Sequence, residues 1–418
     1  MSHIATSPSP ASAAFTLETL QRLALWLLIA SGWFVLVEPA PYELLFAVCL
    51  VFFLPTGLNV PRVTAPFIIF LTLYNVGGIA SLGQVLNDSK AVMFTVVSVY
   101  MAVTSMFLAF CVAADPMDRM AIIRNAYVFA GVLSAITGMI GYFNIGGMGA
   151  AWAPIERAQG TFKDPNVLST FLIPPAIFLI QGFLLGTIKW RFISASALLI
   201  ILAALFLAFS RGAWISMAGA TLLLVGLTFI VTPSLKLRMR IIVLVTLGAV
   251  LLVALIALLL SIEQVRMLFT ERASLVQNYD AGETGRFGRQ LNSIPLLLDN
   301  PFGFGPVQFR NIFGGDPHNV YLNAFASYGW LGGISYILLI LATLAASWKA
   351  ISTRTPWQHH AIAVFCPLFT TILQGVQIDT DHWRHFYLLV GLIWGLYAAA
   401  VAYRPAKTDT AIPAPARA

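Results

Sequence analysis

Long apolar runs separated by short polar connections dominate the chain. About twelve of them reach the roughly 20 residues that an α-helix needs to cross the hydrocarbon core of a bilayer. They lie near 20–37, 43–59, 64–82, 91–113, 121–143, 167–186, 191–209, 212–232, 241–262, 319–347, 359–378 and 384–403. The pattern therefore predicts an all-α, polytopic membrane protein of about twelve transmembrane helices in a single domain, 16–403.

Some of these runs contain residues that interrupt helices. The tenth run is long and carries Gly329, Gly332 and Gly333, which predicts a broken or steeply tilted helix. The sixth run contains Pro174 and Pro175, which predict a kink, because neighbouring helices can satisfy the freed backbone groups.

Composition supports the membrane assignment. Hydrophobic residues make up 59% of the chain and charged residues 10%, whereas a soluble domain carries about a quarter charged residues. Three cysteines in 418 residues exclude a disulfide scaffold. The segments 1–15 and 404–418 are rich in Ala and Pro, so we expect disordered tails, and the first apolar run is too long for a cleavable signal peptide.

The distribution of charge predicts the orientation. If the N-terminus is cytoplasmic, the inner segments hold 14 of the 24 Lys and Arg residues but only four of the 17 Asp and Glu residues. This bias follows the positive-inside rule and places both termini in the cytoplasm. The net charge of +7 is thus a topology signal, and we expect no nucleic-acid partner.

Two predicted outer loops are long, at 144–166 and 263–317. Within the second, the stretch 285–300 sets apolar Phe287, Leu291, Ile294, Leu297 and Leu298 apart from Arg286, Arg289 and Gln290, although Pro295 would bend a helix there. The pattern indicates an amphipathic helix at the membrane surface, or equally a helix that only packs over the bundle. This loop is therefore predicted to be partly helical.

Polar residues gather on the outer side, where the positive-inside rule disfavours arginine. They are Arg157, Lys163, Arg211, Arg286, Arg289, Arg310 and His318, followed by Asp379, Asp381, His382, Arg384 and His385. Arg211 could anchor a helix end in the headgroups, but arginine also suits the binding of a lipid diphosphate through its forked donors. His318 could be a capping histidine or could take a proton from a sugar hydroxyl.

The outer stretches contain neither zinc-ligand spacing nor a phosphate-binding Gly-Lys-Ser/Thr loop. We therefore expect chemistry that needs no metal and no cofactor. No charged residue lies near the middle of a predicted span, which argues against an ion-coupled transporter.

Five short motifs follow one another on the outer side. They are Arg157-Ala-Gln-Gly-Thr-Phe-Lys-Asp-Pro-Asn166, Ser210-Arg211-Gly212, Gly285-Arg286-Phe287, Asn300-Pro-Phe-Gly-Phe-Gly305 and His318-Asn-Val-Tyr-Leu322. In this order they resemble the O-antigen ligase and O-antigen polymerase superfamily. One departure is Asp164-Pro165-Asn166, where the family is associated with Asn-Pro-Asn.

The resemblance implies a glycosyltransferase of the bacterial inner membrane with a periplasmic active site. Such enzymes move a glycan from undecaprenyl diphosphate to an acceptor hydroxyl. The acceptor is lipid A–core in ligases and a second lipid-linked glycan in polymerases. By the resemblance, Arg211, Arg286 and Arg157 would bind the donor diphosphate and His318 would be the catalytic residue. Candidate acceptor or glycan contacts are Lys163, Asn319, Asp381 and Arg384.

The resemblance favours a ligase acting in lipopolysaccharide biosynthesis. A polymerase that joins repeat units of O-antigen or exopolysaccharide remains the alternative, because the two differ only in acceptor. A polysaccharide flippase or exporter fits less well, because the charges lie at one face and not within the bundle. A non-catalytic scaffold of a polysaccharide assembly complex is a further alternative.

Overall fold

The computed structural model describes residues 16–37, 39–272, 282 and 285–404. Except for Arg404, the predicted tails 1–15 and 404–418 lie outside the described residues. Across the described ranges every regular element is helical and no strand occurs, which confirms the predicted all-α class. A helix lies within each of the twelve apolar runs.

The α-helices, in chain order, are α1 (Leu17–Ala30), α2 (Pro41–Phe53), α3 (Ala65–Leu82), α4 (Ser89–Ala114), α5 (Pro116–Tyr142), α6 (Gly149–Trp152), α7 (Pro165–Phe171), α8 (Ile173–Leu185), α9 (Arg191–Leu207), α10 (Arg211–Val231), α11 (Leu235–Leu260), α12 (Glu263–Arg272), α13 (Arg286–Asp299), α14 (Phe309–Phe313), α15 (Val320–Ser352), α16 (Gln358–Gln374) and α17 (Arg384–Ala402). In the described part of the chain, eight helical segments are long and apolar enough to cross a membrane. The chain is therefore a polytopic membrane protein, and a count of twelve spans stays a prediction.

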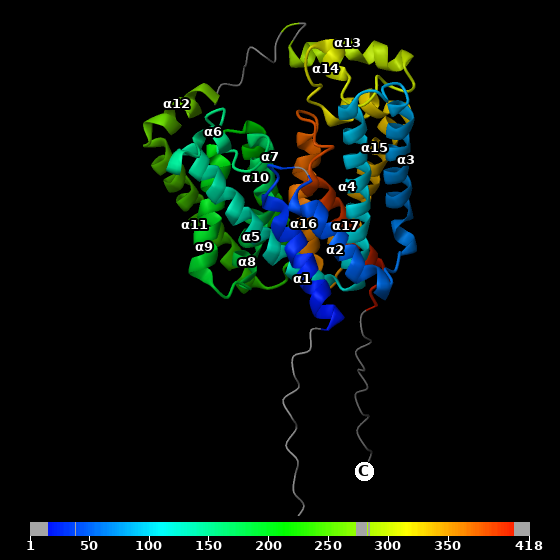
Figure 1. Cartoon of the computed structure of the whole chain (residues 1–418). Helices are drawn as coiled ribbons and strands as arrows, with labels where there is room; N and C mark the ends of the chain where they lie inside the picture. Colours follow the sequence, from blue (N-terminus) through cyan, green and yellow to red (C-terminus); the bar gives the residue numbers. More distant parts are fainter. Residues whose placement is uncertain (1–15, 38, 273–281, 283–284, 405–418) are drawn as a thin grey trace, which may run out of the picture.

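The long helices run side by side, and their two ends differ (Figure 1). Helices α13 and α14 lie across one end of the bundle, which we call the α13 end. The start of α1 and the end of α17 lie at the opposite end. Helices α5 and α8 to α11 form one side of the bundle, and α3, α4, α15 and α17 form the other.

Both predicted helix interruptions occur. Helix α15 is interrupted at Gly329, whose φ of 65° and ψ of −169° are non-helical. The run near Pro174 and Pro175 is divided at Leu172 into α7 and α8. The helix predicted in 285–300 is α13, and Pro295 lies inside it.

The loop 300–305 fits into the interruption of α15. Trp330 donates its backbone N–H to the carbonyl of Pro301 at 2.8 Å, and Phe304 donates to the carbonyl of Ala326 at 2.7 Å. A Cβ at Gly329 would lie 2.5 Å from the Pro301 carbonyl oxygen, so only glycine permits this approach. The broken helix thus receives the loop that carries the Asn-Pro-Phe-Gly-Phe-Gly motif.

Helices α3 and α15 approach each other closely through glycines. A Cβ at Gly77 would lie 2.6 Å from the backbone nitrogen of Gly332 and 2.8 Å from the carbonyl oxygen of Tyr328. Small residues at a helix contact let the backbones approach, which is a common way to associate helices in a membrane.

The substitution Gly77→Ala is therefore expected to destabilise the fold by about 1–3 kcal/mol, because the added methyl overpacks backbone atoms. Thermal unfolding of the detergent-purified protein measures the change. Gly226→Ala in α10 is the control, because no atom lies within 4 Å of a Cβ there. A Gly77→Ala protein as stable as the Gly226→Ala protein would contradict the close approach of α3 and α15.

Candidate functional site

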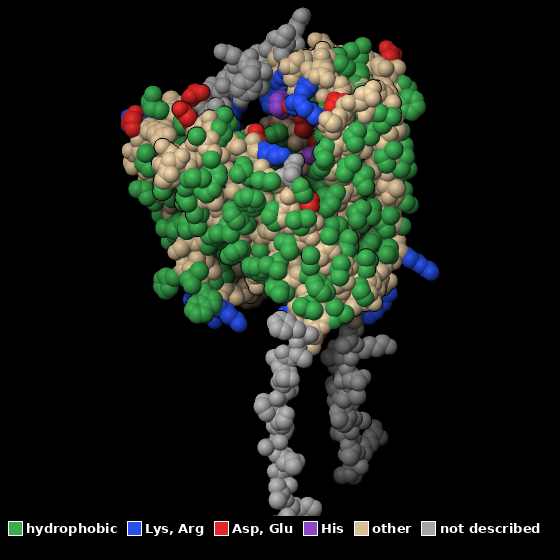
Figure 2. Space-filling view, in the orientation of Figure 1, with side chains coloured by type: hydrophobic (Ala, Val, Ile, Leu, Met, Phe, Trp, Pro, Cys, Tyr) green, Lys and Arg blue, Asp and Glu red, His purple; other side chains and the backbone are tan. Residues whose placement is uncertain are grey.

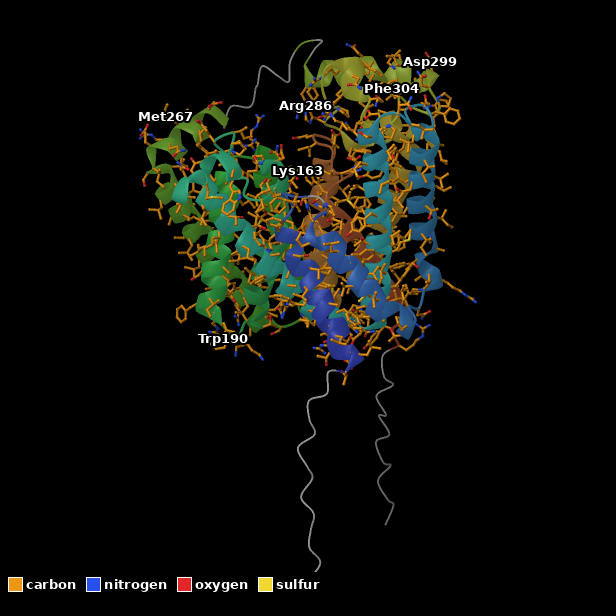
Figure 3. All side chains as sticks on the ribbon, in the orientation of Figure 1. Lys163, Trp190, Met267, Arg286, Asp299 and Phe304 are labelled. Carbon is orange, nitrogen blue, oxygen red and sulfur yellow. The ribbon has the colours of Figure 1, made fainter. Side chains whose placement is uncertain are left out.

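Charged side chains gather at the α13 end. Figure 2 shows this end hollowed in the middle of the view, with Lys or Arg, His and acidic side chains around the opening and a mainly hydrophobic surface below. In Figure 3, Arg286 and Lys163 both lie at this end, in the middle of the view. We call this region, which includes His318, Arg286 and Arg289, the polar hollow.

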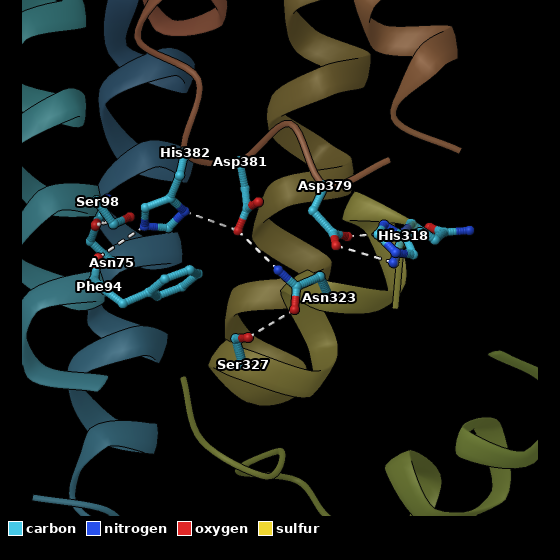
Figure 4. Close-up of polar contacts among 10 residues, drawn as sticks. Asn75, Phe94, Ser98, His318, Asn323, Ser327, Asp379, Asp381 and His382 are labelled. Carbon is cyan, nitrogen blue, oxygen red and sulfur yellow. Dashed lines mark hydrogen bonds and ion pairs between the residues drawn. The ribbon is translucent and has the colours of Figure 1, made fainter. Parts of the chain in front are cut away.

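The backbone around His318 is held by the side chain of Asp379. Asp379 accepts the N–H of His318 on Oδ2 at 3.1 Å and the N–H of Asn319 on Oδ1 at 2.9 Å (Figure 4). Gln290 of α13 donates its side-chain amide to the carbonyl of Pro317 at 2.7 Å. His318 itself has a φ of 48°, a left-handed conformation in which His is among the enriched residue types.

Asn319, predicted to contact acceptor or glycan, is the N-cap of α15. Its side-chain oxygen accepts the N–H of Leu322 at 3.1 Å. The next residue, Val320, donates its N–H to the carbonyl of Gly375 at 2.8 Å. The start of α15 is thus joined to the end of α16, and His318 stands directly before this junction.

Four charges from three elements act on the His318 imidazole. Burial lowers its pKa below the usual 6.5, and Arg286 and Arg289 lower the pKa further. Asp316 and Asp164 act in the opposite direction and raise it. The net result favours a neutral imidazole at neutral pH, which is the form that can accept a proton.

The pKa of Asp379 moves upward to about 8. Burial is the main cause, and the neighbouring charge of Asp381 adds to it. The N–H groups of Asn319 and His318 lower the pKa because they stabilise the carboxylate.

Arg286 and Arg289 occupy the first turn of α13. Arg286 donates Nη1 to the carbonyl of Gln377 at 3.3 Å, and its guanidinium lies 4.8 Å from the centre of the Phe287 ring. Arg289 packs directly against Gly315. A helix N-terminus and two guanidinium groups together favour a bound anion.

Arg211 begins α10, directly after the capping residue Ser210, whose hydroxyl accepts the N–H of Ala213 at 3.4 Å. One turn further, Ser216 donates its hydroxyl to Gln374 of α16 at 3.2 Å. Gln374 is followed by Gly375, Gln377 and Asp379, which contact Val320, Arg286 and His318. The segment 374–379 therefore joins the elements that carry Arg211, Arg286 and His318.

Arg157 is positioned differently from the other arginines. It is buried, and its guanidinium donates Nε to the carbonyl of Ala208 at 2.8 Å and Nη2 to the carbonyl of Phe209 at 3.2 Å. A further bond of 3.1 Å joins Nη2 to Asn166. These contacts fix the turn before Ser210 and Arg211, so Arg157 holds Arg211 in place.

Asp381 and Arg384, predicted to contact acceptor or glycan, are engaged within the protein. Asp381 is buried, accepts the side-chain amide of Asn323 at 3.1 Å and lies 3.2 Å from Nδ1 of His382 (Figure 4). Arg384 donates Nε to Glu43 at 2.8 Å. Lys163 lies on the wall of a cavity below the polar hollow.

Sequence reasoning did not assign a role to Asp379, Gln290 or Arg289. The available signal was Asp379-Thr-Asp381, two acids in a short turn between apolar runs. Its partner at His318 lies about 60 residues away in sequence, and no local pattern shows that pairing. No group of three or more His, Cys, Asp or Glu residues in the described chain is arranged to hold a metal ion.

With this geometry in place, comparison with known families is informative. Residues 196–337 match the family model described as O-antigen ligase. Over these residues the chain is similar to the O-antigen ligase family. This match confirms the resemblance to the O-antigen ligase and polymerase superfamily and supports an activity of that type. The matched residues include Arg211, Arg286 and His318, whereas Arg157 and Asp379 lie outside the match. No curated protein matches the chain.

Proposed function

We propose that this protein is a glycosyltransferase that moves a glycan from undecaprenyl diphosphate to a hydroxyl of lipid A–core. The observation that carries the proposal is the placement of His318 beside Arg286 and Arg289, with its backbone held by Asp379. This transfer requires a base that takes the proton of the acceptor hydroxyl and positive groups that bind the diphosphate.

The donor is already activated, because a diphosphate is a good leaving group. When the bond between the anomeric carbon and the diphosphate oxygen breaks, the negative charge of the leaving group increases. Arg211, Arg286 and the N-terminus of α13 would stabilise that charge, and fixed donors do so without reorganisation. Arg289 adds a second guanidinium at the same helix end.

The acceptor oxygen forms the new bond to the anomeric carbon and loses its proton. His318 would take this proton on a ring nitrogen, since its pKa is held below the usual value. Lys163 and Asn319 lie near enough to the polar hollow to contact glycan, whereas Asp381 and Arg384 would act by holding the last loop in place.

The proposal places the polar hollow in the periplasm and both chain ends in the cytoplasm of the bacterial inner membrane. The mainly hydrophobic belt in Figure 2 and the excess of Lys and Arg toward the opposite end support this orientation. Lipid-linked glycans would then reach the site from the outer leaflet.

A clean gene deletion tests the reaction. We expect long polymer to remain on undecaprenyl diphosphate and lipid A–core to be bare, with both changes reversed by the wild-type gene. Accumulation of single repeat units would instead identify a polymerase. Unchanged lipopolysaccharide with a missing secreted polymer would make exopolysaccharide the acceptor. If the deletion changed neither the lipid-linked glycans nor the lipopolysaccharide nor the secreted polymer, the proposal would be wrong.

A further inference from the structure

A pocket of about 630 Å³ lies at the end of the bundle opposite the α13 end. Its walls come from the start of α9, at Arg191, and from the first turns of α11, between Ser234 and Leu244. Trp190, which directly precedes Arg191, lies at this end in Figure 3, whereas Met267, which follows α11, lies at the other end. The pocket is therefore a site separate from the polar hollow, and we call it the basic pocket.

Three cations line the basic pocket, namely Arg191 from α9 and Lys236 and Arg240 from α11. Arg191 and Lys236 are exposed. No Asp or Glu occurs between Asp164 and Glu263, and this stretch contains the whole of α8, α9, α10 and α11. These four helices therefore supply no carboxylate that could pair with the three cations.

Arg240 is held in place by the end of α8. Its guanidinium donates Nη2 to the carbonyl of Phe183 at 3.1 Å. It also packs against Gly186, which has a φ of 74° and where a Cβ would lie 2.5 Å from Nη1. A guanidinium that is already fixed loses little side-chain freedom when it binds a phosphate.

The other walls of the basic pocket are mostly apolar and continue along a helix that faces lipid. They include Leu237, Met239, Val243 and Leu244. Val243 and Leu244 lie about 10 Å further along α11 than Lys236, by the rise of an α-helix. Only 6% of the apolar stretch of α11 is buried inside the protein. Hydrocarbon chains can therefore contact α11 directly beyond the cations.

Aromatic side chains place the basic pocket at the level of the lipid headgroups. Trp190 and Phe192 flank Arg191 and are largely exposed, and aromatic residues are typical of the membrane–water interface. The positive-inside rule explains an excess of Lys and Arg at this end, but it does not require three cations from two helices to line one pocket. A basic pocket between helices at this level suits the phosphate of a lipid.

We propose that the basic pocket binds the phosphate of an anionic glycerophospholipid, whose acyl chains lie along α11. Arg191, Lys236 and Arg240 bind the phosphate, and Val243 and Leu244 contact the chains. This inference goes beyond the proposed function, because it uses no residue of the polar hollow. The proposed orientation makes the leaflet that supplies this lipid the cytoplasmic one.

Two double variants remove the same charge from the same end of the bundle. Arg191→Gln with Lys236→Gln removes two exposed cations of the basic pocket. Arg62→Gln with Arg354→Gln is the matched control, because Arg62 lies in the turn before α3 and Arg354 shortly after α15, both are exposed, and neither lines the pocket. All four side chains are exposed, so the unfolding temperature without added lipid should stay the same in both variants.

The test adds dioleoyl phosphatidylglycerol, dioleoyl phosphatidylethanolamine or glycerophosphate to the detergent-purified full chain and measures the first binding event by native mass spectrometry. In the wild type and in the control, we expect phosphatidylglycerol to bind about tenfold more tightly than the zwitterionic lipid. In the pocket variant this preference should fall below about threefold, and each single substitution should remove part of it. Glycerophosphate should not bind at concentrations that saturate the site with phosphatidylglycerol.

The contrary outcomes are distinct. A preference for phosphatidylglycerol that persists in the pocket variant, or that is absent in the wild type, overturns the assignment. An equal loss in the control would assign the preference to the overall charge of this end and also overturn it. Glycerophosphate that binds as tightly as phosphatidylglycerol would make the basic pocket a site for a soluble phosphate and not for a lipid.

Discussion

Arg211→Ala is expected to lower the rate of glycan transfer about 100- to 1,000-fold, which is the usual effect of removing one fixed donor from a developing negative charge. The fold should persist, because Ser210 and not Arg211 caps α10, and because Arg211 is only half-buried. The rate can be measured in membranes that contain lipid-linked donor and acceptor, together with the amount of inserted protein.

Two variants control this experiment. Arg211→Lys keeps the positive charge but loses the forked donors, so its rate should lie between those of the wild type and Arg211→Ala. Arg266→Ala removes an exposed arginine of α12 that pairs with Glu263, and should transfer glycan at the wild-type rate. Normal transfer by Arg211→Ala would instead show that Arg211 only anchors a helix end in the headgroups.

The helices could be predicted from the sequence because hydrocarbon leaves few alternatives. Backbone groups in lipid must be satisfied within the segment, so an apolar run of sufficient length becomes a helix. The interruption at Gly329 could also be predicted, because glycine weakens a helix. The loop that fills the interruption could not, because Pro301 and Phe304 meet α15 through backbone groups that carry no sequence signal.

The residues of the candidate site could be proposed from the sequence, but their surroundings could not. An arginine on the outer side is notable by its position alone, yet the structure places Arg157 and Arg211 in different surroundings. The guanidinium of Arg157 donates hydrogen bonds to the carbonyls of Ala208 and Phe209 in the turn after α9. The sequence does not show that this turn lies next to Arg157. The same holds for Asp381 and Arg384, whose partners Asn323 and Glu43 lie far away in sequence.

His318→Asn is expected to reduce transfer about 100- to 10,000-fold, the usual contribution of a positioned acid or base. Asparagine tolerates the left-handed backbone at this position, so the bonds from the backbone to Asp379 should persist. An imidazole that serves only as a polar cap would be replaced by the amide with little loss. The rate per inserted protein, measured with saturating donor, distinguishes the two roles.

The pH dependence of the wild type gives a second test of the same residue. Because burial, Arg286 and Arg289 lower the pKa of His318, the imidazole stays neutral as pH falls to 6.5, and kcat/KM should decline only below that value. Asp379, with a pKa of about 8, gains its proton as pH falls through about 8, so its titration occurs at higher pH than the acid limb expected for His318. Bound diphosphate adds negative charge beside the two arginines, so the acid limb of kcat should lie at higher pH than that of kcat/KM.

His318→Asn should lack the acid limb altogether and show a low rate that does not change between pH 5 and 7. An acid limb that persists in this variant would assign the proton transfer to another group. A wild-type acid limb of kcat/KM above pH 6.5 that disappears in His318→Asn would contradict the buried, arginine-flanked environment of the imidazole. The persistent limb would leave Arg211 as the tested part of the site and remove His318 as the base.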